Sequence, residues 1–168
     1  DHPIGYKWLH ERIGSNYRLT EIQSALGRIQ LKRLNEMNCI RERNALILRN
    51  SLKDISFLKL PYPPNNIKHA WYKFYLFLDP KALKEDWSRD RIIKEISDNG
   101  YPCFSGGCGE IYLEKGIKEL GLTPKKRLPI AQKLAETSLM FCIHPTISEN
   151  AMFYYSEVIR KTILNASK

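Results

Sequence analysis

An aromatic-rich run, residues 71–78, reads Trp-Tyr-Lys-Phe-Tyr-Leu-Phe-Leu and ends at Asp79-Pro80. Successive side chains of an extended strand point to opposite faces, with a period of two residues. Such a strand puts Tyr72, Phe74, Leu76 and Leu78 on one face and Trp71, Lys73, Tyr75 and Phe77 on the other. Aromatic side chains favour a pleated, half-buried surface, so residues 71–78 predict a strand of a sheet whose faces other elements cover.

A helix is predicted to start after Thr20. Thr20 and Gln23 have the spacing of a capping box, in which each side chain accepts a hydrogen bond from the other residue's backbone amide. Apolar residues then recur at helical spacing, at Ile22, Ala25, Leu26, Ile29, Leu31 and Leu34. The pattern continues to residue 53 with a low-propensity stretch at 35–38, so one long helix or a helix pair fits it.

The remaining segments complete an alternating order of helices and strands. We predict short strands at 56–60, 101–104 and 139–143, helices at 89–99, 130–137 and 148–166, and a glycine-rich loop at 105–109. Gly100 provides a left-handed C-cap for one helix, and Ser148 provides an N-cap for the last. The order indicates an α/β (α+β) layer with a small mixed or antiparallel sheet packed by helices.

Composition narrows the class of protein. A chain of 168 residues, 43% of them hydrophobic, can bury a core, and no apolar stretch approaches the roughly 20 residues that span a membrane.

The chain has neither an initiator Met nor a signal-peptide pattern, so we expect it to begin inside a longer protein. Four scattered cysteines favour reduced thiols and a cytoplasmic location, and Cys103 and Cys108 lack the partner pair of a zinc site. The net charge of +9 is consistent with binding to nucleic acid or to an anionic small molecule. It is equally consistent with the chain being half of a protein whose other half is acidic.

A candidate anion site precedes the first helix. Asn16, Tyr17 and Arg18 are consecutive there, and amide protons at a helix start together with a guanidinium favour phosphate. The structural alternative is that Asn16 is a turn residue and Arg18 a solvated charge.

The same segment carries a family resemblance. The residues that carry the resemblance follow one another in this order: 14–27 (Gly-Ser-Asn-Tyr-Arg-Leu-Thr-Glu-Ile-Gln-Ser-Ala-Leu-Gly), Gln30, Leu31, Leu34, Arg41, Arg43, Ala45, His69-Ala70-Trp71-Tyr72, Leu128-Pro129-Ile130-Ala131 and His144-Pro145. This order resembles the DegT/DnrJ/EryC1/StrS family of sugar aminotransferases, whose fold is fold type I. The resemblance implies that 20–168 form the C-terminal small domain with its leading helix, and that 1–19 are an irregular lead-in from the cofactor domain. That missing N-terminal domain would hold pyridoxal phosphate on a lysine. None of Lys7, Lys32 or Lys73 has the right context, so we expect the chain alone to be inactive.

The resemblance also implies site residues. Asn16 matches an asparagine that reaches across a homodimer to the cofactor phosphate, Arg18 lies beside it, and Tyr17 lines the same pocket. In residues 100–112 the chain departs from the family's substrate loop, and we expect Ser105, Cys108 and Glu110 to face the sugar or its nucleotide. The alternative is that the glycines only make turns and the cysteines only pack. His69 is a further substrate-binding candidate, although a structural histidine is the commoner case at a strand end.

The predicted function is that of a C-terminal fragment of a sugar-nucleotide aminotransferase, with no part in nucleic-acid or membrane binding. As the resemblance implies, the full-length dimer would pass an amino group, commonly from glutamate, to a nucleotide-linked keto-sugar. One alternative is a nucleic-acid-binding module that uses the basic residues of the first helix, although these alternate with Glu36 and Glu42. Another alternative is a non-catalytic dimerisation domain.

Overall fold

The computed structural model describes residues 14, 15 and 17–168, which fall into two compact units divided between Asn35 and Glu36. The predicted lead-in over 1–19 lies largely outside the described residues, and its boundary stays a prediction. Over the described part of the chain, no helix is long and apolar enough to cross a bilayer.

Helix α1 (Glu21–Leu52) confirms the predicted capping box. The Thr20 backbone N–H donates to Gln23 Oε1 over 3.0 Å, and the Gln23 N–H donates to Thr20 Oγ1 over 3.3 Å. These two bonds satisfy amide donors that the first turn of a helix leaves without partners. The helix has no break at 35–38, so the sequence pattern belongs to one long helix.

A four-stranded sheet forms the centre of the second unit, in the order β1-β2-β4-β3. The strands are β1 (Leu58–Lys59), β2 (Phe74–Leu78), β3 (Cys103–Phe104) and β4 (Ser138–Phe141). Each neighbouring pair is antiparallel, and Phe74 is opposite Phe141 while Leu76 is opposite Leu139. Of the two sheet types that the sequence left open, the antiparallel one is present.

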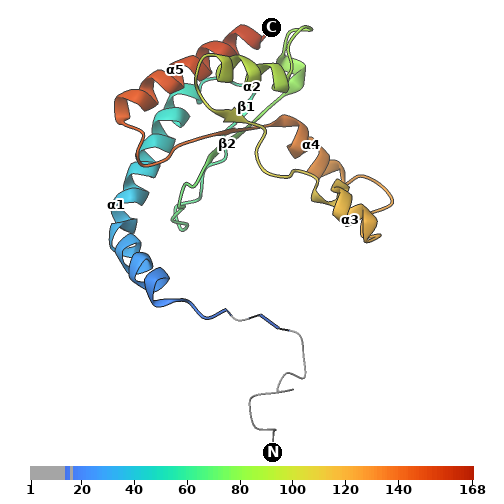
Figure 1. The fold of residues 1–168 in the computed structure, drawn as a ribbon. Helices are drawn as coiled ribbons and strands as arrows, with labels where there is room; N and C mark the ends of the chain where they lie inside the picture. Colours follow the sequence, from blue (N-terminus) through green and yellow to red (C-terminus); the bar gives the residue numbers. More distant parts are fainter. Residues whose placement is uncertain (1–13, 16) are drawn as a thin grey trace, which may run out of the picture. The chain divides into compact units, whose positions relative to one another are not determined.

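The core lies on the sheet face that presents Phe74, Leu76 and Leu78. Helices α2 (Arg89–Asp98) and α5 (Glu149–Ala166) lie together over this face (Figure 1). The C-terminal half of α1 adds Ala45, Leu48 and Leu52 to the same core. Each fully buried side chain of this kind stabilises the fold by about 1.5–3 kcal/mol relative to exposure.

Two predicted helix ends are confirmed by their hydrogen bonds. Gly100 has φ +86°, its N–H donates to Ser97 O over 2.9 Å, and the Tyr101 N–H donates to Ile96 O over 3.3 Å. This pair of bonds is a Schellman motif, which needs a residue in the left-handed region. At the start of α5, Ser148 Oγ accepts from the Ala151 N–H over 3.2 Å.

The predicted strand at 71–78 was too long at its start. Strand β2 begins at Phe74 because Trp71 adopts φ +47°, which breaks the extended alternation. Trp71 is therefore buried with Phe74, whereas Tyr72, predicted to share the face of Phe74, is exposed. Three short elements were also missed: η1 (Pro80–Ala82), η2 (Ile111–Leu113) and α3 (Lys115–Glu119).

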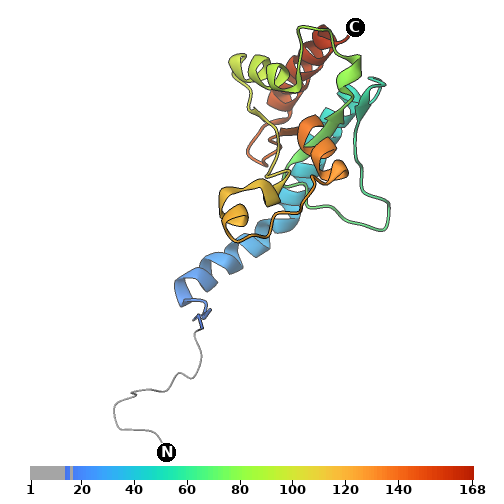
Figure 2. The ribbon, with the colours of Figure 1, turned by 90° about the vertical axis from the view of Figure 1, so that its right-hand side faces the viewer.

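Helix α4 (Pro129–Thr137) lies on the other side of the sheet from α2 and α5 (Figure 2). It begins at Pro129, where proline suits the first helical turn because that turn has no use for the missing N–H. Beyond α4 this second face keeps exposed aromatic side chains, and the candidate site is built there.

Candidate functional site

The second face of the sheet is only partly covered. Tyr75 and Phe104 are each paired with Met140 of β4, one on either side, so the three side chains share this face. Tyr75 is 36% exposed and Phe104 is 45% exposed. The chain leaves β3 at Phe104 and enters the glycine-rich loop directly, which brings this loop to the open face.

Two glycines of the loop allow close packing. Gly106 has φ +107°, and a Cβ on it would lie 2.9 Å from Tyr75 Cε1. A Cβ on Gly109 would lie 2.5 Å from the Cβ of Ala135 in α4. The Ser105 carbonyl accepts a hydrogen bond from Ser138 Oγ over 2.5 Å. Gly106 and Gly109 therefore allow the loop to pack closely on β2 and α4, in addition to any role in turning the chain.

Glu110 is tied to the segment that precedes α4. Its Oε1 accepts from Arg127 Nε over 3.0 Å and from the Tyr112 hydroxyl over 2.5 Å, and Arg127 Nη2 also donates to Oε2. Bonds from Arg127, and then from Tyr112, hold the pKa of the Glu110 carboxyl below its ordinary value. The Glu110 side chain is only 8% exposed. The structure thus gives Glu110 a tethering role, and its contact with a substrate stays a prediction.

Cys108 is exposed and its Sγ donates to Glu114 Oε1 over 3.0 Å. The hydrogen bond to this carboxylate raises the pKa of the Cys108 thiol, so the neutral thiol is favoured. No group of three or more His, Cys, Asp or Glu in the described residues could hold a metal ion. Ser105 and Cys108 remain substrate-binding predictions.

His69 lies in the segment before β2 and lines a cavity of about 330 Å³. Its Nδ1 accepts from the Trp71 N–H over 3.0 Å, and its ring lies 4.4 Å from the Trp71 ring, centroid to centroid. Because Nδ1 is the acceptor, a neutral ring carries its proton on Nε2. Tyr75 lines the same cavity, so its ring joins the glycine-rich loop to the surroundings of His69.

The predicted phosphate-binding residues belong to the other unit. Tyr17 is 91% exposed, and Arg18 is exposed as well. Asn16 lies outside the described residues. Within the second unit, the structure brings the glycine-rich loop and the cavity of His69 together through Tyr75.

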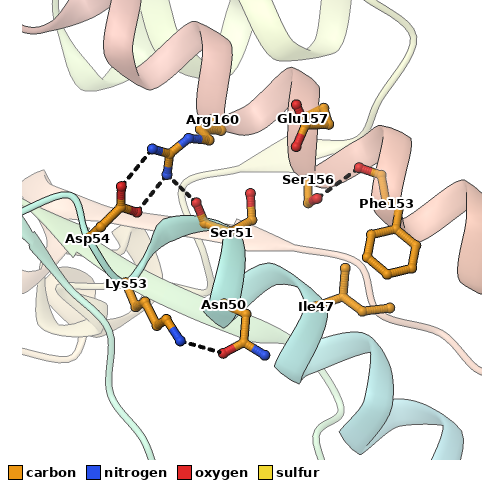
Figure 3. Close-up of a pocket in the computed structure, with 9 residues that line it drawn as sticks. All are labelled: Ile47, Asn50, Ser51, Lys53, Asp54, Phe153, Ser156, Glu157 and Arg160. Carbon is orange, nitrogen blue, oxygen red and sulfur yellow. Dashed lines mark hydrogen bonds and ion pairs between the residues drawn. The ribbon is translucent and has the colours of Figure 1, made fainter.

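A second groove, of about 500 Å³, was not predicted from the sequence (Figure 3). Arg160 of α5 donates to both carboxylate oxygens of Asp54 over 2.6 Å each and also to the Ser51 carbonyl. The hydrogen bond from Arg160 lowers the pKa of Asp54 to about 2. Arg160 and Asp54 therefore neutralise each other's charge. Together with the bond to Ser51, this ion pair joins α5 to the end of α1. The partners are 106 residues apart, so no local sequence signal could have found them.

Residues 3–160 match the sequence profile of the DegT/DnrJ/EryC1/StrS aminotransferase family. The chain belongs to this family. It is 30% identical over 145 residues to the erythromycin biosynthesis sensory transduction protein EryC1 of Saccharopolyspora erythraea, covering 86% of this chain and 37% of that protein. It is 25% identical over 172 residues to the spore coat polysaccharide biosynthesis protein SpsC of Bacillus subtilis, covering 95% of this chain and 41% of that protein.

Solved structures agree with the DegT/DnrJ/EryC1/StrS assignment. An aminotransferase from Psychrobacter cryohalolentis has a TM-score of 0.85 and 42% identity, covering 99% of this chain and 44% of that one. Helicobacter pylori PseC, an aminotransferase involved in the biosynthesis of pseudoaminic acid, has a TM-score of 0.79 at 22% identity, which shows a shared fold. That match covers 92% of this chain and 40% of PseC. The chain spans less than half the length of these relatives.

Proposed function

We propose that this chain is the C-terminal part of a pyridoxal-phosphate-dependent aminotransferase that transfers an amino group from glutamate to a nucleotide-linked keto-sugar. The observation that carries the proposal is the family match over residues 3–160. Relatives named for spore coat polysaccharide and pseudoaminic acid biosynthesis support a sugar as the acceptor. The full-length protein would act as a cytoplasmic homodimer, with its Schiff-base lysine in the part of the protein that precedes this chain.

The segment before α1 has the donor chemistry that a cofactor phosphate requires. Arg18 supplies a guanidinium, exposed Tyr17 a hydroxyl and Asn16 an amide, immediately before the N-terminal turn of a helix. The Thr20–Gln23 capping bonds fix the start of this helix, which the three donor residues precede closely in the sequence. Such a donor set fits a phosphate monoester. When bound, pyridoxal phosphate supplies the electron sink for amino transfer.

A substitution at Asn16 tests this phosphate contact in the full-length protein. We expect Asn16→Ala to lower the fraction of cofactor retained after dialysis, because one phosphate donor is lost. Asn165→Ala is the matched control, since Asn165 is exposed on α5. Cofactor absorbance after dialysis measures retention, and equal retention in wild type and Asn16→Ala contradicts the assignment.

The glycine-rich loop and His69 supply one wall of the proposed substrate pocket. Ser105 and Cys108 lie on the loop that Gly106 holds against Tyr75, and His69 lies in the cavity that Tyr75 lines. The Glu110–Arg127 tether keeps the far end of this loop near α4. In this arrangement the chain's residues orient the substrate, while the reacting atoms are held by the cofactor-binding part of the enzyme.

The proposed reaction is tested with the full-length protein, pyridoxal phosphate, glutamate and a panel of nucleotide-linked keto-sugars. The proposal predicts catalytic release of 2-oxoglutarate only when a nucleotide-linked keto-sugar is present. Release with simple keto acids alone, and none with any keto-sugar nucleotide, overturns the substrate assignment.

A further inference from the structure

Arg89 joins helices that lie on opposite faces of the sheet (Figure 2). It is the first residue of α2, which covers the core face, and its guanidinium reaches the C-terminal end of α4 on the second face. There Nη1 donates to the Ala135 carbonyl over 3.0 Å and to the Ser138 carbonyl over 3.2 Å. Its Nε donates to Asp90 Oδ1 over 2.6 Å, and the side chain is only 18% exposed. A mostly buried guanidinium therefore connects α2 to the end of α4.

The C-terminal end of α4 requires a partner of this kind. The last carbonyls of a helix have no amide of their own helix to accept from, and a cation near them also offsets the negative end of the helix dipole. The last turn of α4, residues 134–137, contains no basic side chain. Arg89 supplies both the donor and the charge from a segment 46 positions away in the sequence. The position of this helix end therefore depends on Arg89.

The two residues whose carbonyls bind Arg89 also contact the glycine-rich loop. A Cβ on Gly109 would lie 2.5 Å from Ala135 Cβ, so one end of the loop packs directly on Ala135. At the other end, Ser138 Oγ donates a hydrogen bond to the Ser105 carbonyl. Both supports of the loop are thus bonded to the same guanidinium, and a shift of either support would move the loop.

We propose that Arg89 is a positioning residue of the aminotransferase: by fixing Ala135 and Ser138, it sets where the loop at 105–109 lies for the acceptor substrate. The inference rests on the proposed function, in which this loop orients the acceptor. Arg89 bonds to main-chain carbonyls of the two supports, so its effect reaches the loop through them. A guanidinium suits this task because its rigid plane of five N–H donors can serve two carbonyls and Asp90 together. The alternative is a purely structural role, in which Arg89 stabilises the fold and the loop does not depend on it.

The first test compares Arg89→Met with Arg91→Met in the full-length protein. We expect Arg89→Met to raise KM for the keto-sugar nucleotide about tenfold, the equivalent of one charge-assisted hydrogen bond. Its effect on 2-oxoglutarate release from glutamate alone should be much smaller, because the loop orients the acceptor. Arg91→Met removes the same charge from α2, where Arg91 pairs with Asp86, and should leave KM unchanged. Arg89→Lys keeps the charge on a single donor atom, so its KM should lie between those of wild type and Arg89→Met. Thermal unfolding verifies that each variant is folded, and Arg89→Lys replaces Arg89→Met in every comparison if the latter is not.

Two further measurements separate positioning from a purely structural role. Cys108 lies on the loop and donates to Glu114 Oε1 over 3.0 Å, a bond that favours the neutral, less reactive thiol. If Arg89→Met lets the loop shift, this bond weakens, and Cys108 should react with iodoacetamide about three times faster. Ser138→Ala removes the hydroxyl that binds Ser105, so its KM increase and that of Arg89→Lys should combine to less than their product. A purely structural role lowers the unfolding temperature and leaves the Cys108 rate at its wild-type value.

Any of four results overturns the positioning role: a wild-type KM in the Arg89 variants, an equal KM increase in Arg91→Met, an unchanged Cys108 rate, or KM increases that multiply fully in the double variant. If glutamate releases 2-oxoglutarate while the Arg89 variants keep the wild-type KM, the positioning role fails and the aminotransferase proposal stands. If an enzyme that holds its cofactor gives no 2-oxoglutarate from glutamate, the proposed function itself fails. In that case the Cys108 rate still decides whether Arg89 holds the loop.

Discussion

Gly106 lies so close to Tyr75 that a Cβ on the glycine would be 2.9 Å from Tyr75 Cε1. This contact connects the two parts of the candidate site, because Tyr75 lines the cavity of His69 and Gly106 belongs to the loop of Ser105 and Cys108. Few side chains tolerate the φ of +107° at Gly106. The position therefore admits only glycine without a change in the site.

Gly106→Ala is expected to lower the free energy of unfolding by about 1–3 kcal/mol, the cost of a strained backbone conformation. The new Cβ also displaces the Tyr75 ring, so the variant should raise KM for the sugar nucleotide more than it lowers kcat. Chemical denaturation and steady-state kinetics of the full-length enzyme measure the two effects. Wild-type stability in this variant would contradict the packing described here.

Gly109→Ala is expected to lower the free energy of unfolding by about 1–3 kcal/mol through overpacking. Its Cβ would lie 2.5 Å from Ala135 Cβ and 2.9 Å from Ala135 Cα, so the loop and α4 would have to separate. Gly107→Ala is the control in the same loop, because a Cβ there meets nothing within 4 Å. Equal unfolding midpoints for the two variants in denaturant would show that the loop does not pack on α4.

The Glu110–Arg127 tether predicts a pH dependence of stability. The pKa of Glu110 is lowered in the folded chain, so its contribution is fully present above the ordinary glutamate pKa of about 4.3. The contribution is lost as pH falls through the lower folded pKa. Thermal unfolding should therefore show a gap between wild type and Arg127→Gln at pH 7 that closes in acid. Lys126→Gln, at the neighbouring exposed lysine, should show no such closing gap, and a gap of constant size for Arg127→Gln would refute the tether.

The ion pair of Asp54 and Arg160 predicts a pH dependence of stability with the same sign. Because the folded pKa of Asp54 is lowered to about 2, its contribution is present above the ordinary aspartate pKa of about 3.9 and fades toward pH 2. Asp54→Asn should reduce the unfolding temperature at pH 7, and its difference from the wild type should disappear as pH falls through about 2. Glu85→Gln, at an exposed carboxylate before α2, should cause a smaller change at pH 7. An Asp54→Asn variant as stable as wild type at pH 7 would show that solvent screening removes the effect of the pair.

Local signals explain which parts of the fold could be predicted. The Thr20–Gln23 box, the Gly100 C-cap and the Ser148 N-cap each depend on residues within five positions of one another, and all three are confirmed. The apolar periodicity of α2 also held, since Ile92 and Ile96 are buried. Short-range hydrogen bonding and amphipathic spacing are properties of the segment itself.

Long-range contacts explain the rest. Trp71 left its predicted face because its backbone adopts φ +47°, which no alternation pattern encodes, and its ring packs on Phe74 in a core that distant elements complete. The Glu110–Arg127 pair joins residues 17 positions apart, so the sequence offered Glu110 as a ligand without revealing its partner. For the candidate site, the sequence indicated which residues could bind a ligand. The side chains that contact these residues could be identified only from the structure.

The most direct measurement of the central claim follows nitrogen through the reaction. The full-length protein, with pyridoxal phosphate, is incubated with ¹⁵N-glutamate and a nucleotide-linked keto-sugar, and the products are identified by mass spectrometry. The account predicts a ¹⁵N-amino sugar nucleotide together with an equal amount of 2-oxoglutarate. Recovery of the label entirely in glutamate, from an enzyme shown to hold its cofactor, would contradict it for every keto-sugar nucleotide tried.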